Sequence, residues 1–203
     1  MPAEIFHRRS TAIPRSAAIL IALGGMCLAV KALAILLTGV QPPLLFEIAG
    51  LPLGLGLLML GHWSTTQYGR SRLIVVAAIL SSLAALASAS KALLKLAEPL
   101  ESLQAVFGGF GPMVAALLIG LRLRAVGGVA SKVARRALLI SIMFIPLMIL
   151  GAMAAELAGE RFLELGLLAF AALWLLLAHA VGGMSSVSVT VEGRDTPPDL
   201  LAG

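Results

Sequence analysis

Residues 73–90 read LIVVAAILSSLAALASAS and contain no charged side chain. Two more charge-free runs of similar length follow, at 102–121 and 137–155. About 20 apolar residues in a helix cross the hydrocarbon core of a bilayer, and each run comes close to that length. The stretch at 73–90 therefore predicts a transmembrane helix, and the repetition of such runs predicts a multi-pass membrane protein.

The composition of the whole chain agrees with this interpretation. Of its 203 residues, 60% are apolar and only 12% are charged, whereas soluble domains carry about 25% charged residues. The net charge of +5 would suit nucleic-acid binding in a soluble protein. Here the basic residues flank apolar runs, so we assign them to membrane topology and expect the lipid bilayer, not nucleic acid, as the partner.

The predicted fold is an all-α integral membrane bundle of six transmembrane helices. Apolar runs separated by short polar segments place the spans at about 17–39, 44–62, 73–96, 102–122, 137–157 and 163–183. Residues 1–16 are expected to form a cytoplasmic N-terminal segment. Residues 184–203 are expected to form a disordered cytoplasmic tail.

The distribution of Lys and Arg predicts the orientation of these spans. With the N-terminus in the cytoplasm, eleven of the 15 basic residues fall in cytoplasmic segments and only Arg161 falls in an outer turn. The other three lie within spans. This bias follows the positive-inside rule and predicts an inner-membrane or plasma-membrane protein with both termini in the cytoplasm.

Two glycine–proline segments lie inside the second and fourth spans. They read GLPLGLG at 50–56, with Gly50, Pro52 and Gly54, and GGFGP at 108–112, with Gly108, Gly109, Gly111 and Pro112. Proline removes a backbone donor and glycine loosens a helix, so both segments are predicted helix breaks. Paired interruptions of this kind point to binding sites in membrane transporters.

The same segments suggest an internal repeat. Pro52 and Pro112 are 60 residues apart, and so are Lys31 and Lys91. Three helical hairpins repeating with this period would explain the match, although the third hairpin lacks both markers. Coincidence among similar apolar segments is the alternative, and the sequence leaves both open.

Charged and polar residues inside the spans predict a polar cavity. Lys31 lies eight residues from the outer end of its span, where a charge costs about 3 kcal/mol or more unless it is paired or hydrated. Glu47 begins the next span near the same surface, and Ser88 and Lys91 share a face of the third. These four residues are the predicted lining of an outward-facing cavity between the first four spans. Snorkelling and structural ion pairs are the alternative.

Motifs for chemistry are absent from the sequence. It contains no HExxH, GxSxG, P-loop or CxxC pattern, so we expect no catalytic residue, no cofactor and no metal site. An enzymatic role is therefore the least favoured interpretation. We predict a transporter or channel for a small solute, or alternatively a non-catalytic membrane subunit that packs against a partner or forms a homo-oligomer.

Overall fold

The computed structural model describes residues 2–40, 42–94 and 106–192, where the chain forms helices joined by short turns, without a strand. Six helices are long and apolar enough to cross a membrane, which confirms the all-helical, six-span part of the predicted fold. The elements are α1 (Pro2–Thr38), α2 (Pro43–Tyr68), α3 (Arg72–Leu94), the π-helical turn η2 (Val106–Phe110), α5 (Gly111–Val126), η3 (Gly128–Ala130), α6 (Ser131–Ala158), η4 (Glu160–Leu163) and α7 (Glu164–Glu192).

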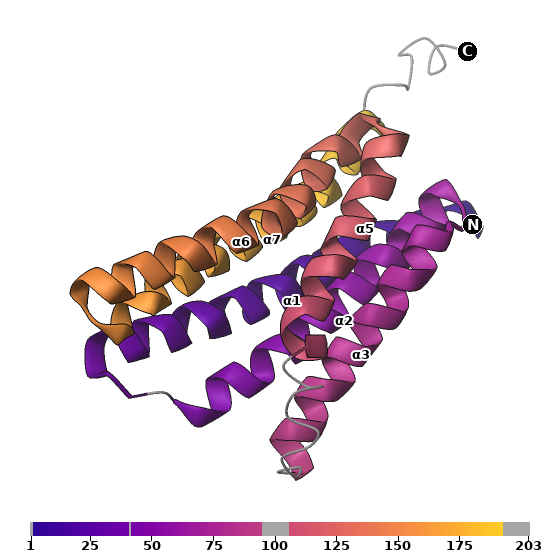
Figure 1. Ribbon diagram of the computed structural model, residues 1–203. Helices are drawn as coiled ribbons and strands as arrows, with labels where there is room; N and C mark the ends of the chain where they lie inside the picture. Colours follow the sequence, from indigo (N-terminus) through magenta and orange to yellow (C-terminus); the bar gives the residue numbers. More distant parts are fainter. Residues whose placement is uncertain (1, 41, 95–105, 193–203) are drawn as a thin grey trace, which may run out of the picture.

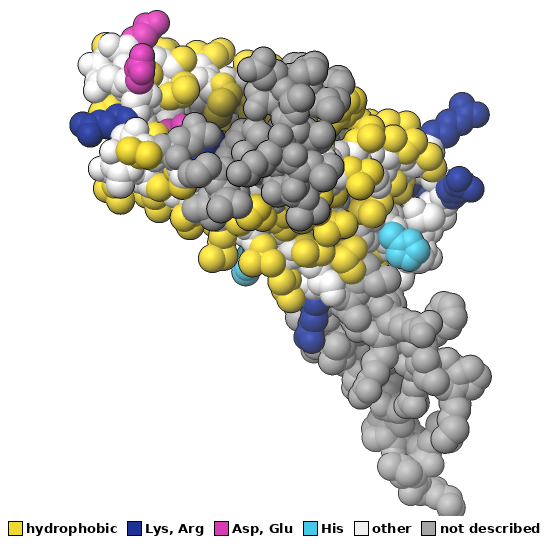
Figure 2. Space-filling model, turned by 90° about the horizontal axis from the view of Figure 1, so that it is seen from below, with side chains coloured by type: hydrophobic (Ala, Val, Ile, Leu, Met, Phe, Trp, Pro, Cys, Tyr) yellow, Lys and Arg dark blue, Asp and Glu magenta, His cyan; other side chains and the backbone are white. Residues whose placement is uncertain are grey.

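The two ends of the bundle differ in charge. The end formed by the α2–α3 and α5–α6 connections, here called the basic end, carries Arg70, Arg72, Arg122, Arg124, Lys132, Arg135 and Arg136. The opposite end, here called the acidic end, carries Glu156, Glu160 and Glu164 with Arg161. Among the coloured residues of Figure 2, hydrophobic side chains predominate between the two ends, and the magenta carboxylates lie toward the left end.

Six apolar helices with charged ends indicate an integral, multi-pass membrane protein. The N-terminal part of α1 and the C-terminal part of α7 lie at the same end, because Gly182 packs against Ala18. The placement of that basic end in the cytoplasm, and of the protein in the plasma membrane, stays a prediction from the positive-inside rule.

The helices extend beyond the predicted spans at the basic end. α1 begins at Pro2, and α7 continues to Glu192, into the segment predicted to be a disordered tail. Residues 193–203 lie outside the described part of the chain. The segment between the predicted fourth and fifth spans, which end at 122 and begin at 137, is helical except for the turn between α5 and α6. Hydropathy marks only the part of a helix that lies in hydrocarbon, whereas caps and breaking residues decide where the helix ends.

Glycine ends the helices at two connections of the basic end. Gly69 follows α2 with φ 79°, and Gly127 follows α5 with φ 76°. Each donates its backbone N–H to the carbonyl four residues earlier, at 3.0 Å to Thr65 and 3.1 Å to Leu123. Glycine adopts positive φ without the strain that a Cβ would add, so these turns are short.

The pairwise contacts between the helices form a closed ring, and Figure 1 shows α6 beside α7 and α2 beside α3. Each helix packs against its neighbours in sequence, from α1 through α2, α3, α5 and α6 to α7, and α7 returns to α1. α2 also touches α5 across the ring, and the Arg122 guanidinium donates a 2.6 Å hydrogen bond to the Tyr68 carbonyl, which joins their C-terminal ends. Because consecutive helices pack continuously, no set of three hairpins stands out. The hairpin arrangement and the 60-residue repeat remain predictions.

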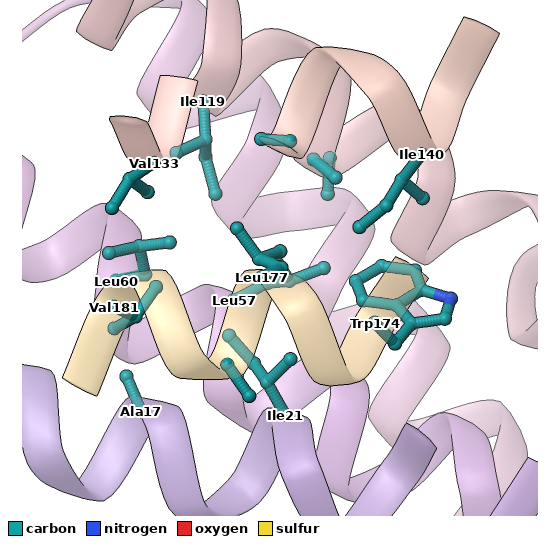
Figure 3. Close-up of a cluster of buried hydrophobic side chains, with 14 of the residues drawn as sticks. Ala17, Ile21, Leu57, Leu60, Ile119, Val133, Ile140, Trp174, Leu177 and Val181 are labelled. Atoms are coloured by element: carbon teal, nitrogen blue, oxygen red, sulfur yellow. The ribbon is translucent and has the colours of Figure 1, made fainter. Parts of the chain in front are cut away.

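The core lies where five helices meet (Figure 3). Trp174, Leu177 and Val181 of α7 are almost completely buried. They pack with Ala17 and Ile21 of α1, Leu57 and Leu60 of α2, Ile119 of α5, and Val133 and Ile140 of α6. Lipid tails are as apolar as these side chains, so close packing, not exclusion from water, holds the helices together.

Small residues bring α2 and α3 close together. A Cβ added at Gly54 would lie 2.5 Å from the carbonyl oxygen of Ser81 and 2.9 Å from the backbone nitrogen of Ala85. Both distances are to the backbone of α3, which cannot move aside as a flexible side chain can. The α2–α3 interface therefore requires glycine at position 54.

We expect Gly54→Ala to destabilise the protein by about 1–3 kcal/mol, the usual range for overpacking. The matched control is Gly182→Ala on α7, where the added methyl would meet Ala18 Cβ at an ordinary 3.7 Å. Thermal unfolding in one detergent should give a lower midpoint for the first variant and an unchanged or higher midpoint for the second. Equal midpoints would contradict the close approach of α2 and α3.

Candidate functional site

Lys31 places a charged group in the protein interior. It is 6% exposed, and among the buried residues of the described chain it alone has a charged side chain. It lies seven residues before Thr38, the end of α1, which is roughly 10 Å along the helix at 1.5 Å per residue. Its burial means that the side chain faces protein and not lipid. A buried ammonium needs a partner or water, and Lys31 has an interaction partner in this structure.

The two glycine–proline segments meet beside Ser88. A Cβ added at Gly50 of α2 would overlap Ser88 Oγ of α3, and it would lie 3.2 Å from the carbonyl oxygen of Gly108 in η2. A Cβ at Gly108 would in turn lie 3.5 Å from Ser88 Oγ. Three of the residues singled out from the sequence thus form one close contact between α2, α3 and η2, here called the small-residue contact.

The other residues of the two segments have separate surroundings. Gly54 packs on α3 one turn further along α2. A Cβ at Gly111 would lie 3.4 Å from both the Leu80 carbonyl oxygen and Ala84 Cβ, whereas Gly109 is exposed and meets nothing within 4 Å. Pro52 and Pro112 are both buried. Most of the two segments therefore serves helix packing.

The first segment does not break its helix, which corrects the prediction made for it. α2 is a continuous α-helix through 50–56 with Pro52 inside it. An internal proline removes one backbone hydrogen bond and costs about 3 kcal/mol or more. Packing of α2 against both α1 and α3 offsets this cost.

The second segment changes the type of helix. The π-helical turn η2 passes directly into α5, whose first turn contains Pro112. Proline suits the first turn of a helix because its missing N–H would have no helical partner there. Single π-helical turns are rare and occur frequently at functional sites.

Glu47 and Lys91 occupy helical positions beyond the small-residue contact, toward the acidic end. Glu47 precedes Gly50 by three residues on α2, and Lys91 follows Ser88 by three on the antiparallel α3. Both positions therefore lie roughly 4.5 Å nearer the acidic end than the contact. The side chains of Glu47 and Lys91 lie outside the described part of the structure.

Lys31 lies on the same side of the small-residue contact. A Cβ at Gly24 of α1 would lie 3.1 Å from the carbonyl oxygen of Ala49, which neighbours Gly50 on α2. Lys31 follows Gly24 by seven residues, so it lies roughly 10 Å nearer the acidic end. The charged positions thus occupy the acidic-end half of the bundle. On their basic-end side, the small-residue contact brings α2, α3 and η2 close together.

An aromatic series, which the sequence analysis missed, connects η2 to α7. Ring centroids are 5.4 Å apart between Phe110 and Phe144, 5.1 Å between Phe144 and Phe170, and 6.0 Å between Phe170 and Trp174, all in edge-to-face arrangement. Such pairs contribute about 0.5–1.5 kcal/mol beyond burial. The spacing of four between Phe170 and Trp174 was the available signal.

A basic pocket, also missed, lies between α6 and α7 at the basic end. Its volume is about 790 Å³, and Lys132, Arg135 and Arg136 line it from the start of α6. His179 and Leu176 line it from α7. The sequence analysis assigned these cations to membrane topology alone. Their spacing of three and four residues, which puts them on one helix face, was the available signal.

In the described part of the chain, no group of three or more His, Cys, Asp or Glu side chains is placed to hold a metal ion. Comparisons of the chain with protein-family models, curated proteins and solved structures gave no match. The fold and its sites define the class of an integral, multi-pass membrane protein. Its activity has to be argued from its own residues.

The small-residue contact predicts energetic coupling between positions 50 and 88. We expect Gly50→Ala to destabilise the protein because the new methyl overlaps Ser88 Oγ. Ser88→Ala removes that oxygen, so the double variant should recover part of the loss, with a coupling energy of about 0.5–3 kcal/mol. Thermal unfolding of the two single variants and the double variant measures this coupling. Strictly additive losses would show that the two side chains do not meet.

Proposed function

We propose that the protein is a transporter or channel for a small solute, with a polar entrance at its acidic end. The observation that carries the proposal is the burial of Lys31 deep in a membrane-spanning helix. Ionisable residues inside a membrane are costly, face the protein interior, and commonly mark substrate or ion pathways. The positive-inside rule would put this entrance on the outer side of the membrane.

The arrangement of the neighbouring helices supports this proposal. The positions of Glu47, Ser88 and Lys91 lie on α2 and α3 within about two helical turns of the level of Lys31. Ser88 belongs to the small-residue contact, which lies on the basic-end side of the Glu47 and Lys91 positions and packs α2, α3 and η2 closely at that depth. An entrance that is polar toward the acidic end and closed toward the basic end would hold a solute on one side of the membrane, as alternating access requires. The proposed lining holds two lysines and one glutamate, and its net positive charge favours an anionic solute.

A non-catalytic membrane subunit remains the second candidate, and the surface of α6 favours it. Ile142, Ile145 and Ile149 are 56–65% exposed, and α6 has the smallest buried share of the six spans. In a bilayer this face contacts either lipid or another membrane helix. A partner or a second copy of the chain would dock on this face of α6.

Cysteine accessibility tests the entrance. In a Cys27→Ala background, which removes the single native cysteine, we would introduce Ala34→Cys, Lys91→Cys or Ser81→Cys. Ala34 follows Lys31 by one turn toward the acidic end, so this variant keeps the lysine. We expect a membrane-impermeant thiol reagent added at the acidic end to modify positions 34 and 91, because water reaches both.

Ser81 provides the internal control. It is fully buried and lies seven residues from Ser88 toward the basic end, so a cysteine there should stay unmodified. Protection of positions 34 and 91 in correctly folded protein would refute the entrance. Purification with one stoichiometric membrane partner, together with that protection, would support the subunit function.

A further inference from the structure

The basic pocket between α6 and α7 is separate from the proposed entrance and lies at the other end of the bundle. Three cations line it from successive positions of one helix face, Lys132, Arg135 and Arg136. In the described part of the chain, none of these three side chains forms a hydrogen bond or an ion pair. A concave site with three uncompensated positive charges favours an anion.

The start of α6 adds to the positive potential of this pocket. α6 begins at Ser131, which lines the pocket, and its N-cap residue Ala130 provides no side-chain hydrogen bond. The Ser131 N–H donates to the Gly128 carbonyl of η3, so the start of α6 contributes through its helix dipole, which makes this end positive. Phosphate oxygens bind well at such an end when cations lie beside it.

The position of the pocket relative to the membrane indicates whether the phosphate belongs to a phospholipid or is free in solution. Its cations lie at the basic end, just before the charge-free run that begins at residue 137. Its other wall descends along α7 through Ala180 to Leu176, which are apolar and lie within a membrane span. A free phosphate would use only the basic rim, whereas a phospholipid would use both the rim and the apolar wall.

We propose that this pocket binds the headgroup phosphate of an anionic phospholipid, with the first acyl carbons against Leu176 and Ala180. Basic pockets between transmembrane helices, next to the headgroup region, are suited to anionic headgroups. The arginine side chains provide bidentate donors for phosphate oxygens. The binding is independent of the proposed transport activity, since no residue of the entrance takes part.

The test is native mass spectrometry of the full chain in a non-ionic detergent, titrated with dioleoylphosphatidylglycerol. Dioleoylphosphatidylcholine is the zwitterionic control, and millimolar inorganic phosphate is the soluble competitor. We expect a saturable site for phosphatidylglycerol, much weaker binding of phosphatidylcholine, and no displacement by inorganic phosphate. Displacement by inorganic phosphate would overturn the lipid assignment in favour of a soluble anion.

A matched pair of variants separates the pocket from general attraction to the basic end. The pocket variant combines Lys132→Gln, Arg135→Gln and Arg136→Gln. The control variant combines Arg70→Gln, Arg72→Gln and Arg124→Gln, which remove the same charge from exposed positions at the same end. We expect the pocket variant to lose roughly tenfold or more in affinity for phosphatidylglycerol, and the control to lose about twofold or less. Equal losses would refute a specific site.

A second variant tests the pocket without changing any charge. Gly183 lines the pocket, and a Cβ added there meets nothing within 4 Å. Gly183→Phe should therefore fold normally and occupy part of the cavity with its ring. We expect a severalfold loss of phosphatidylglycerol binding at an unchanged thermal midpoint. Unchanged binding would show that the lipid lies outside the pocket.

Discussion

The bilayer leaves the backbone of this chain no solvent to hydrogen-bond with, and the structure follows from that constraint. Each N–H and C=O in hydrocarbon must find its partner inside the same segment, so the spans are helical. The constraint also explains why Pro52 does not break α2. Opening that helix would expose further backbone groups to lipid, whereas keeping it closed loses one hydrogen bond.

Association of the helices then depends on shape, because apolar side chains gain nothing by leaving lipid for protein. The sequence meets this requirement with glycine and serine at the points of closest approach. Gly54 lets α2 reach the backbone of α3, and Gly50 and Gly108 surround Ser88. The large core side chains around Trp174 fill the wider spaces between helices. The close contacts at glycine and the large side chains of the core together define one arrangement of the helices.

The spans were predictable from sequence because bilayer thickness fixes the length of an apolar run. The depth of Lys31 was predictable for the same reason, since position along a helix converts directly to distance. The meeting of Gly50, Ser88 and Gly108 was not, because it depends on the rotation and register of three separate helices. The continuity of α2 was missed because local propensity was given more weight than packing on both sides.

The basic pocket was missed for a different reason. Lys132, Arg135 and Arg136 satisfy the positive-inside rule. Because membrane topology already explains these cations, their presence in the sequence provides no separate reason to expect a binding pocket. Only the structure places α7 opposite these residues and shows the concave space between the two helices.

The π-helical turn η2 has a consequence for the rotation of the fourth span. An α-helix advances by 100° per residue, and a π-helical turn accommodates one extra residue per turn. The residues of η2 are therefore rotated relative to the positions that an α-helix continued backwards from Gly111 would give them. Conversion of η2 to α-helix would turn Gly108 away from Ser88 and shift Phe110 along the aromatic series. The π-helical turn thus determines which face of the fourth span Gly108 turns toward Ser88.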